Sequence, residues 1–142
     1  MNARQTVEKA AAAVARADAK VDSTREDRDE AIRDAAASGQ THAGIARAAG
    51  MSRAQVVGIV QKGAGRARGG DVLARVASSA AAARTAREAR HVEVLARDAV
   101  LAEVADSELM TAAEVARVAG VTRSVVSDAR ARRRAEAEQP AG

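Results

Sequence analysis

The sequence contains no phenylalanine, tyrosine, tryptophan or cysteine, and only one proline in 142 residues. Without aromatic side chains, no large residue can anchor a core, and we expect no small-molecule pocket. Without cysteine, neither a disulfide nor a thiolate-bound metal can hold the fold together. What the sequence does contain is alanine, with 40 residues, against 27 of isoleucine, leucine, valine and methionine together. Alanine, arginine and glutamate are strong helix formers, so we expect an all-α protein with thin cores.

Long apolar runs are also missing. The longest, Val56 to Val60, is far too short to cross a bilayer, and no N-terminal stretch has the order of a signal peptide. We therefore expect a soluble, cytoplasmic protein associated with the nucleoid.

The net charge of +4 is unevenly distributed. Residues 38–70 contain five basic and no acidic residues, a balance of +5. The balance is −1 in 1–37, −1 in 71–106 and +1 in 107–142. The concentration of positive charge predicts a polyanion-binding surface in the 38–70 segment.

The sequence repeats itself. A shift of 70 residues aligns Thr41–Val60 with Thr111–Arg130 without a gap, and eight of these 20 positions are identical, among them Gly50/Gly120 and Arg53/Arg123. A repeat of this kind indicates a duplicated structural unit. The predicted organisation is a long Ala-rich helix at 1–37 that runs into a first helix-turn-helix unit at 31–62, a flexible Gly-rich linker at 63–70, a second long helix at 71–106, a second helix-turn-helix unit at 107–134 and a disordered tail at 135–142.

Each copy has the spacing of a helix-turn-helix. Gly50 and Gly120 suit the left-handed backbone that ends the first of the two helices. Residues with an N-cap side chain precede each helix of the motif: Thr41, Ser52, Thr111 and Thr122. The positions that must be apolar or small are filled by Ile45, Ala46, Ala49, Met51, Val56 and Ile59 in the first copy and by Val115, Ala116, Ala119, Val121, Val126 and Ala129 in the second.

These residues carry a resemblance to known DNA-binding families. Ala31–Lys62, with Ile32 and Ala35–Ala36 in a supporting helix, resembles the helix-turn-helix of resolvases and of sigma-factor promoter-reading domains. Leu109–Arg130, which begins L-M-T-A-A-E-V-A-R-V-A-G-V-T-R, is similar to the motif of excisionase and MerR-type regulators. In such families the second helix enters the major groove, and its early outward residues meet base edges.

The resemblance implies two sets of DNA-binding residues. The first comprises Ser52, Arg53, Ala54, Gln55, Val57, Gly58 and Gln61, with Lys62 near a phosphate. The second comprises Thr122, Arg123, Ser124, Val125, Ser127 and Asp128, with Arg130 and Arg132–Arg134 as backbone contacts or, for the last three, a solvated helix end. Arginine suits guanine and glutamine suits adenine, each through two hydrogen bonds. Because Asp128 repels phosphate and Val125 offers only apolar contact, the second unit either reads few bases or has become a packing module.

The long helices carry small-residue stripes. Val7, Val14 and Val21 recur every seven residues, as in a coiled-coil seam. In the second arm, Val94, Leu101 and Ala105, with Leu95 and Val104 beside them, form a stronger stripe. The two arms can pair with each other inside one chain or with a second copy in a homodimer; for residues 1–20 a solvated single helix is the alternative.

No residue pattern supports catalysis. His42 and His91 are isolated, and no nucleophile–base pair, metal-ligand cluster or phosphate-binding loop is present in the sequence. We expect neither enzyme activity nor a cofactor nor a bound metal.

The sequence thus predicts a double-stranded DNA-binding protein, bacterial or phage in type, that regulates transcription. Its two units are expected to grip successive stretches of one duplex about one helical turn, ~34 Å, apart or a multiple of that, with the linker setting the spacing. Two alternatives stay open. One is a DNA-packaging or segregation protein with little sequence preference, and the other is a protein-interaction scaffold that docks on the transcription machinery.

Overall fold

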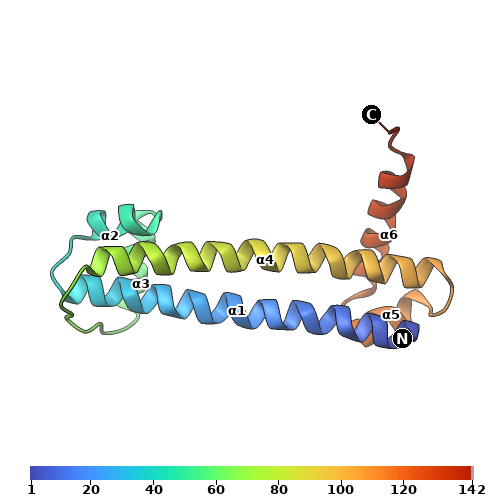
Figure 1. Cartoon of the computed structure of the whole chain (residues 1–142), viewed down its shortest axis with the longest axis horizontal. Helices are drawn as coiled ribbons and strands as arrows, with labels where there is room; N and C mark the ends of the chain where they lie inside the picture. The colour runs from blue at the N-terminus through green and yellow to red at the C-terminus, as the bar shows by residue number, and fades with distance from the viewer. Residues whose placement is uncertain (142) are drawn as a thin grey trace. The chain divides into compact units, whose positions relative to one another are not determined.

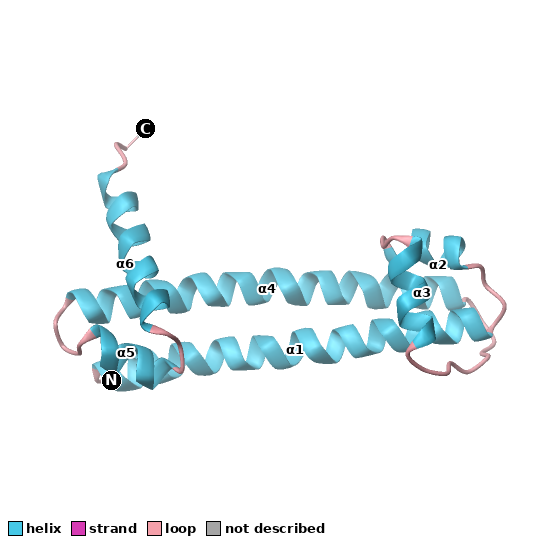
Figure 2. Cartoon of the chain, turned by 180° about the vertical axis from the view of Figure 1, so that it is seen from behind, coloured by secondary structure: helices cyan, strands magenta, loops and turns pink. Residues whose placement is uncertain are grey.

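The computed structural model describes residues 1–141, and over that range its regular secondary structure consists of helices alone, joined by loops (Figures 1 and 2). The six helices are α1 (Ala3–Ala37), α2 (His42–Ala49), α3 (Arg53–Gln61), α4 (Val72–Asp106), α5 (Ala112–Ala119) and α6 (Arg123–Glu138). The expected all-α class is confirmed. Among the described residues, no helix combines the length and apolar character needed to span a membrane.

The helices form two compact units. The α2–α3 unit spans Ala19–Glu88, and the α5–α6 unit joins Met1–Asp18 to the residues from Ala89 onward. Each unit contains the second half of one long helix, the two short helices that follow it, and the first half of the other long helix. The sequence suggested two successive halves instead, because it gave no sign that the start of α1 packs in the same unit as the end of α4.

The core of the α2–α3 unit is made of small and medium aliphatic side chains. Its largest members, Ile32, Ile45 and Val56, are completely buried and come from three different helices. Burying a side chain of this size contributes roughly 1.5–3 kcal/mol. Alanines fill the contacts between these anchors, which lets the helices approach closely. The full buried cluster is Ala31, Ile32, Ala35, Ile45, Ala46, Ala49, Val56, Val72, Val76 and Ala80.

The α5–α6 unit repeats this design with different residues. Its buried cluster is Val7, Leu101, Val104, Ala105, Val115, Ala116 and Val126. In both units α1 and α4 supply residues to the same cluster, so the arms pair with each other inside the chain. Of the two alternatives for the arms, pairing inside one chain is the one that the structure shows.

Two details of the predicted stripes differ. The inward stripe of α4 follows Val94, Asp98 and Leu101. Because each residue along a helix is rotated by about 100° from the one before it, Leu95 points away from this stripe and is 43% exposed. Val21 is only half-buried.

The tail is shorter than predicted. We expected disorder over 135–142, but α6 continues to Glu138. The helix-forming run of arginine, alanine and glutamate extends it past the end of the repeat.

Candidate nucleic-acid interface

The connection between α2 and α3 is a tight turn. The backbone of Gly50 is left-handed, with φ of 65°, and the N–H of Met51 donates to the carbonyl of Ala46 at 3.0 Å. This is the hydrogen bond of a Schellman motif, which satisfies a carbonyl at the end of α2. α3 then begins at Arg53, so only three residues separate the two helices.

The N-caps of the short helices hold α2 and α3 in place. The hydroxyl of Thr41 accepts from the N–H of Gly44 at 3.0 Å. Ser52 and Gln55 form a capping box: the Ser52 hydroxyl accepts from the Gln55 N–H at 3.2 Å, and the Ser52 N–H donates to Gln55 Oε1 at 3.0 Å. Side-chain caps of this kind stabilise a helix by about 1 kcal/mol.

Arginines from the long helices fix the C-terminal ends of α2 and α3. Arg84 donates to the carbonyl of Ala49 at 3.1 Å, and Arg33 donates to the carbonyl of Ile59 at 3.1 Å. Both carbonyls belong to the last turn of a helix, where the regular i→i+4 pattern runs out; the Ile59 carbonyl also accepts from the Lys62 N–H at 3.2 Å. Neither arginine contact was predicted, since Arg33 and Arg84 lie 26 and 35 residues from their partners.

The predicted DNA-binding residues of the first unit lie on the outside of α3. Val57 and Gly58 are half-buried, and the remaining ones are exposed: Ser52, Arg53, Ala54, Gln55, Gln61 and Lys62. Arg53 and Lys62, at the two ends of α3, have no ion-pair partner among residues 1–141. The residue before α3 and the helix itself thus present an accessible face with a cation at each end.

Gln55 differs from its expected role. Its Oε1 accepts the Ser52 N–H in the capping box. Reading adenine requires both the oxygen and the nitrogen of the amide. The Gln55 oxygen would therefore have to be shared between the cap and adenine.

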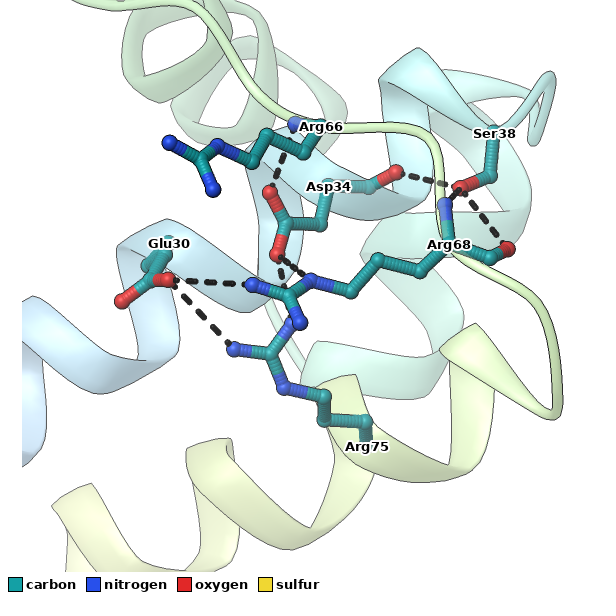
Figure 3. A network of polar contacts seen from close by, with 6 residues as sticks. All are labelled: Glu30, Asp34, Ser38, Arg66, Arg68 and Arg75. Carbon is teal, nitrogen blue, oxygen red and sulfur yellow. Dashed lines mark hydrogen bonds and ion pairs between the residues drawn. The ribbon is translucent and has the colours of Figure 1, made fainter.

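A buried carboxylate of the α2–α3 unit lies at the centre of a polar network (Figure 3). Asp34, on α1, is 2% exposed and accepts from the Arg66 N–H at 2.8 Å, from Arg68 Nε at 2.7 Å and from Arg75 Nη1 at 2.6 Å. Glu30 lies 3.6 Å from Arg68 and 3.8 Å from Arg75. The three donors of Asp34 come from 32 to 41 residues away, so one side chain joins α1, the 63–70 segment and α4.

The same contacts set the ionisation of Asp34. Burial raises the pKa of this carboxyl, but the hydrogen bonds from the Arg66 N–H and from the guanidinium groups of Arg75 and Arg68 outweigh burial and lower the pKa to about 2. Asp34 is therefore charged at neutral pH. A charged buried carboxylate with three donors is satisfied, which is the condition for burying it.

The 63–70 segment is not the flexible linker that we expected. Both of its ends belong to the α2–α3 unit, so it cannot set the spacing between the two units. Its backbone is held on α1 by Asp34 and by the Ser38 hydroxyl, which accepts from the Arg68 N–H at 3.0 Å. Gly65 passes so close to α1 that a Cβ there would lie 2.1 Å from the carbonyl oxygen of Arg33. The glycines of the 63–70 segment thus end α3 and also let the segment pack closely against α1.

Charge separates the two units. The α2–α3 unit contains 12 basic and 8 acidic residues, whereas the α5–α6 unit contains 11 of each. The whole net charge of +4 therefore belongs to the α2–α3 unit. Part of the positive charge that the sequence assigned to 38–70 is neutralised by Asp34 and Glu30 through Arg68.

The α5–α6 unit has the same turn with a different distribution of caps. Gly120 is left-handed with φ of 69°, and the Val121 N–H donates to the Ala116 carbonyl at 3.0 Å. Thr111 and Glu114 form a capping box, whose hydrogen bonds from the Thr111 backbone and side chain lower the pKa of Glu114. Thr122 has the extended backbone of an N-cap, but its side chain makes no capping hydrogen bond, contrary to our expectation.

The predicted DNA-binding residues of the α5–α6 unit divide into two groups. Thr122, Arg123, Ser124 and Ser127 are exposed at the start of α6, together with Asp128. The arginines further along α6 form ion pairs with carboxylates of α4. Arg130 Nε lies 2.6 Å and Arg133 Nη1 3.8 Å from the carboxylate oxygens of Asp106, and Arg132 Nη1 lies 3.5 Å from Asp98 Oδ2. The structure thus brings these cations to α4, where a phosphate would have to compete for them.

Comparisons of the chain with protein-family models, with curated sequences and with solved structures find no match. Among residues 1–141, no group of three or more histidine, cysteine or acidic side chains is arranged to hold a metal ion.

Proposed function

We propose that the α2–α3 unit is a helix-turn-helix that binds double-stranded DNA through the outer face of α3, and that the protein is a regulator of transcription. The observation that carries the proposal is the exposed face of α3, with Arg53 and Lys62 at its ends, neither of them in an ion pair with another residue of 1–141. The segment 38–70 around it contains no acidic residue. A helix of this kind enters the major groove, where arginine reads guanine and lysine contacts phosphate.

The rigidity of the unit supports the same proposal. α2 and α3 are fixed at both ends, by Thr41 and Ser52 at the start of each helix and by Arg84 and Arg33 at the last turns. A recognition helix must be presented in one orientation, because an ordered surface loses less entropy when it binds. The left-handed Gly50 and the short connection of three residues between α2 and α3 support the same proposal.

The α5–α6 unit supports DNA binding less well. It has no net charge, it places Asp128 where α3 has Gly58, and it holds three of its arginines against Asp98 and Asp106. We assign it a minor share of DNA contact.

A second candidate function is DNA packaging or segregation with little sequence preference. The capping role of Gln55 favours it, since the outer face of α3 then keeps only Arg53 and Gln61 with side chains that suit base edges and take no part in a cap. A third candidate, a protein-interaction scaffold, is favoured by exposed apolar residues: Val92 is 63% and Leu109 71% exposed, both in the α5–α6 unit.

Selection of duplexes from a random-sequence library, using the full chain at low salt, separates these candidates. The proposal predicts that duplexes are retained and share a short consensus. Retention without a consensus identifies packaging, and no retention contradicts DNA binding and leaves the scaffold. The matched control is the chain with Arg53→Ala and Lys62→Ala, which should retain duplexes poorly under the same conditions.

A further inference from the structure

We infer that Arg66, in the segment after α3, is a further DNA contact: it binds a backbone phosphate beside the groove that α3 enters. The inference rests on the proposed function of the α2–α3 unit. It assigns a role to a residue that the resemblance to helix-turn-helix families does not include.

The first observation is the state of the Arg66 side chain. Three arginines surround Asp34, but only Arg68 and Arg75 give it their guanidinium groups; Arg66 gives it the backbone N–H alone. Figure 3 shows the guanidinium of Arg66 directed away from the carboxylate. The side chain is exposed and has no acidic partner among residues 1–141.

The second observation is the fixed backbone that carries it. The Arg66 N–H is held by Asp34 at 2.8 Å, and the next anchored residue, Arg68, is held by Ser38 through its own N–H. On the other side, Gly65 lies directly against the backbone of α1. An arginine on a flexible loop loses backbone freedom when it binds, whereas this one is already positioned.

The third observation is its place in the chain. Arg66 is four residues after Lys62, the C-cap of α3, so an extended chain places the two at most about 14 Å apart. The distance is short enough for both to serve one side of a duplex. Arg68 follows two residues later, but its guanidinium is bound to Asp34 at 2.7 Å and is not available.

The phosphate contact makes a specific salt prediction. Each phosphate that a protein neutralises adds about 0.9 to the slope of log affinity against log salt. Removing one contact should reduce that slope by about 1 and weaken binding about five- to tenfold near 100 mM salt, to the same extent for every sequence.

Arg66→Ala and Arg87→Ala in the full chain test the inference against a matched control. Arg87 is an exposed arginine of α4 in the same unit, without an ion pair among the described residues, so both variants lose one charge from one unit. Alanine retains the N–H that Asp34 binds, and helicity by circular dichroism checks that the fold is kept. Duplex affinity is measured by anisotropy with a labelled DNA over a range of salt concentrations.

The inference predicts a lower affinity and a smaller slope for Arg66→Ala, no change for Arg87→Ala, and recovery of the slope in Arg66→Lys. Equal losses in the two alanine variants would show an effect of net charge and overturn it. An unchanged Arg66→Ala beside a weakened Arg53→Ala would overturn it while leaving the proposed function intact. Absence of duplex binding by the unmodified chain would remove both.

Discussion

The α2–α3 and α5–α6 units share a plan and differ in their surfaces. Both close their turns with a left-handed glycine, Gly50 or Gly120, and both bury the same positions of the repeat, such as Val56 and Val126. Outside these positions they diverge. The α2–α3 unit carries the whole net charge, and the cations of α3 have no ion pair among residues 1–141. α6 is nearly twice as long as α3, with 16 residues against nine, and three of its five arginines pair with α4. Packing therefore constrains the positions that build the fold, and the surface distinguishes the two units.

The largest difference should appear when a carboxylate is neutralised in each unit. Asp34→Asn removes the negative charge and one of the two acceptor oxygens that Arg66, Arg68 and Arg75 bind. Because this network is nearly buried, we expect the α2–α3 unit to lose about 3 kcal/mol of stability. Asp106→Asn, the control in the α5–α6 unit, breaks a partly exposed pair with Arg130 and should cost about 0–1 kcal/mol. Because the chain contains no aromatic residue to report on unfolding, amide hydrogen exchange is the measurement that follows the stability of each unit separately. Equal losses of protection in the two variants would contradict the comparison.

Acid should weaken the α2–α3 unit through the same carboxylate. The pKa of Asp34 in the folded chain is about 2, below its ordinary value of 3.8. A lowered pKa means that the contribution is fully present above about pH 5 and is lost as the pH falls toward 2, a change of about 2 kcal/mol. Exchange of the amides from residue 65 to residue 68 between pH 6 and pH 2.5 tests this, with Asp34→Asn as the control that should lack the extra loss. Amides that stay equally protected over this range would rule out Asp34 as the anchor.

The close approach of the 63–70 segment to α1 gives a smaller effect. Gly65→Ala places a methyl group against the backbone of Arg33, so the segment must move, and we expect a loss of about 2 kcal/mol. Gly69→Ala is the matched control, since a Cβ at that position meets no atom within 4 Å. Thermal unfolding followed by circular dichroism at 222 nm compares them. If both variants melt at one temperature, the segment does not pack on α1.

The caps give the smallest effect. Ser52→Ala removes the capping box of α3 and should cost about 1 kcal/mol, whereas Thr122→Ala removes a side chain that makes no capping bond and should change stability by less than about 0.5 kcal/mol. The two residues occupy equivalent positions of the repeat. Thermal unfolding of both variants measures the difference, and a larger effect at Thr122 would reverse this part of the comparison.

Local features of the fold could be predicted from the sequence. The helical class follows from composition, and the buried face of each short helix follows from apolar spacing, as with Ile45 and Ala49. The left-handed glycines and three of the four N-cap side chains were also correct, because each depends on residues within one turn of the helix.

Long-range features could not be predicted. Asp34 takes its partners from Arg66, Arg68 and Arg75, and nothing within one turn of α1 encodes those pairs. The one available signal was a charged residue beside Ala31 and Ala35 on the buried side of α1. The packing of the start of α1 with the end of α4 was equally hidden, because alanine-rich faces fit many partners. For the candidate site, exposure along α3 agreed with the spacing. The capping role of Gln55 was missed, although its place three residues after Ser52 is the sequence signature of a capping box.

Arg53 and Arg123 occupy the same position of the repeat, at the first residue of α3 and of α6. Both are exposed and free of ion pairs among residues 1–141, so alanine at either should leave the fold unchanged. The affinity of the full chain for a selected duplex, measured for Arg53→Ala and Arg123→Ala side by side, is therefore the most direct test. We expect Arg53→Ala to weaken binding about tenfold or more, in keeping with the loss of a bidentate guanine contact, and Arg123→Ala by less than about threefold. Equal effects, or a larger effect of Arg123→Ala, would contradict the assignment of DNA binding to the α2–α3 unit.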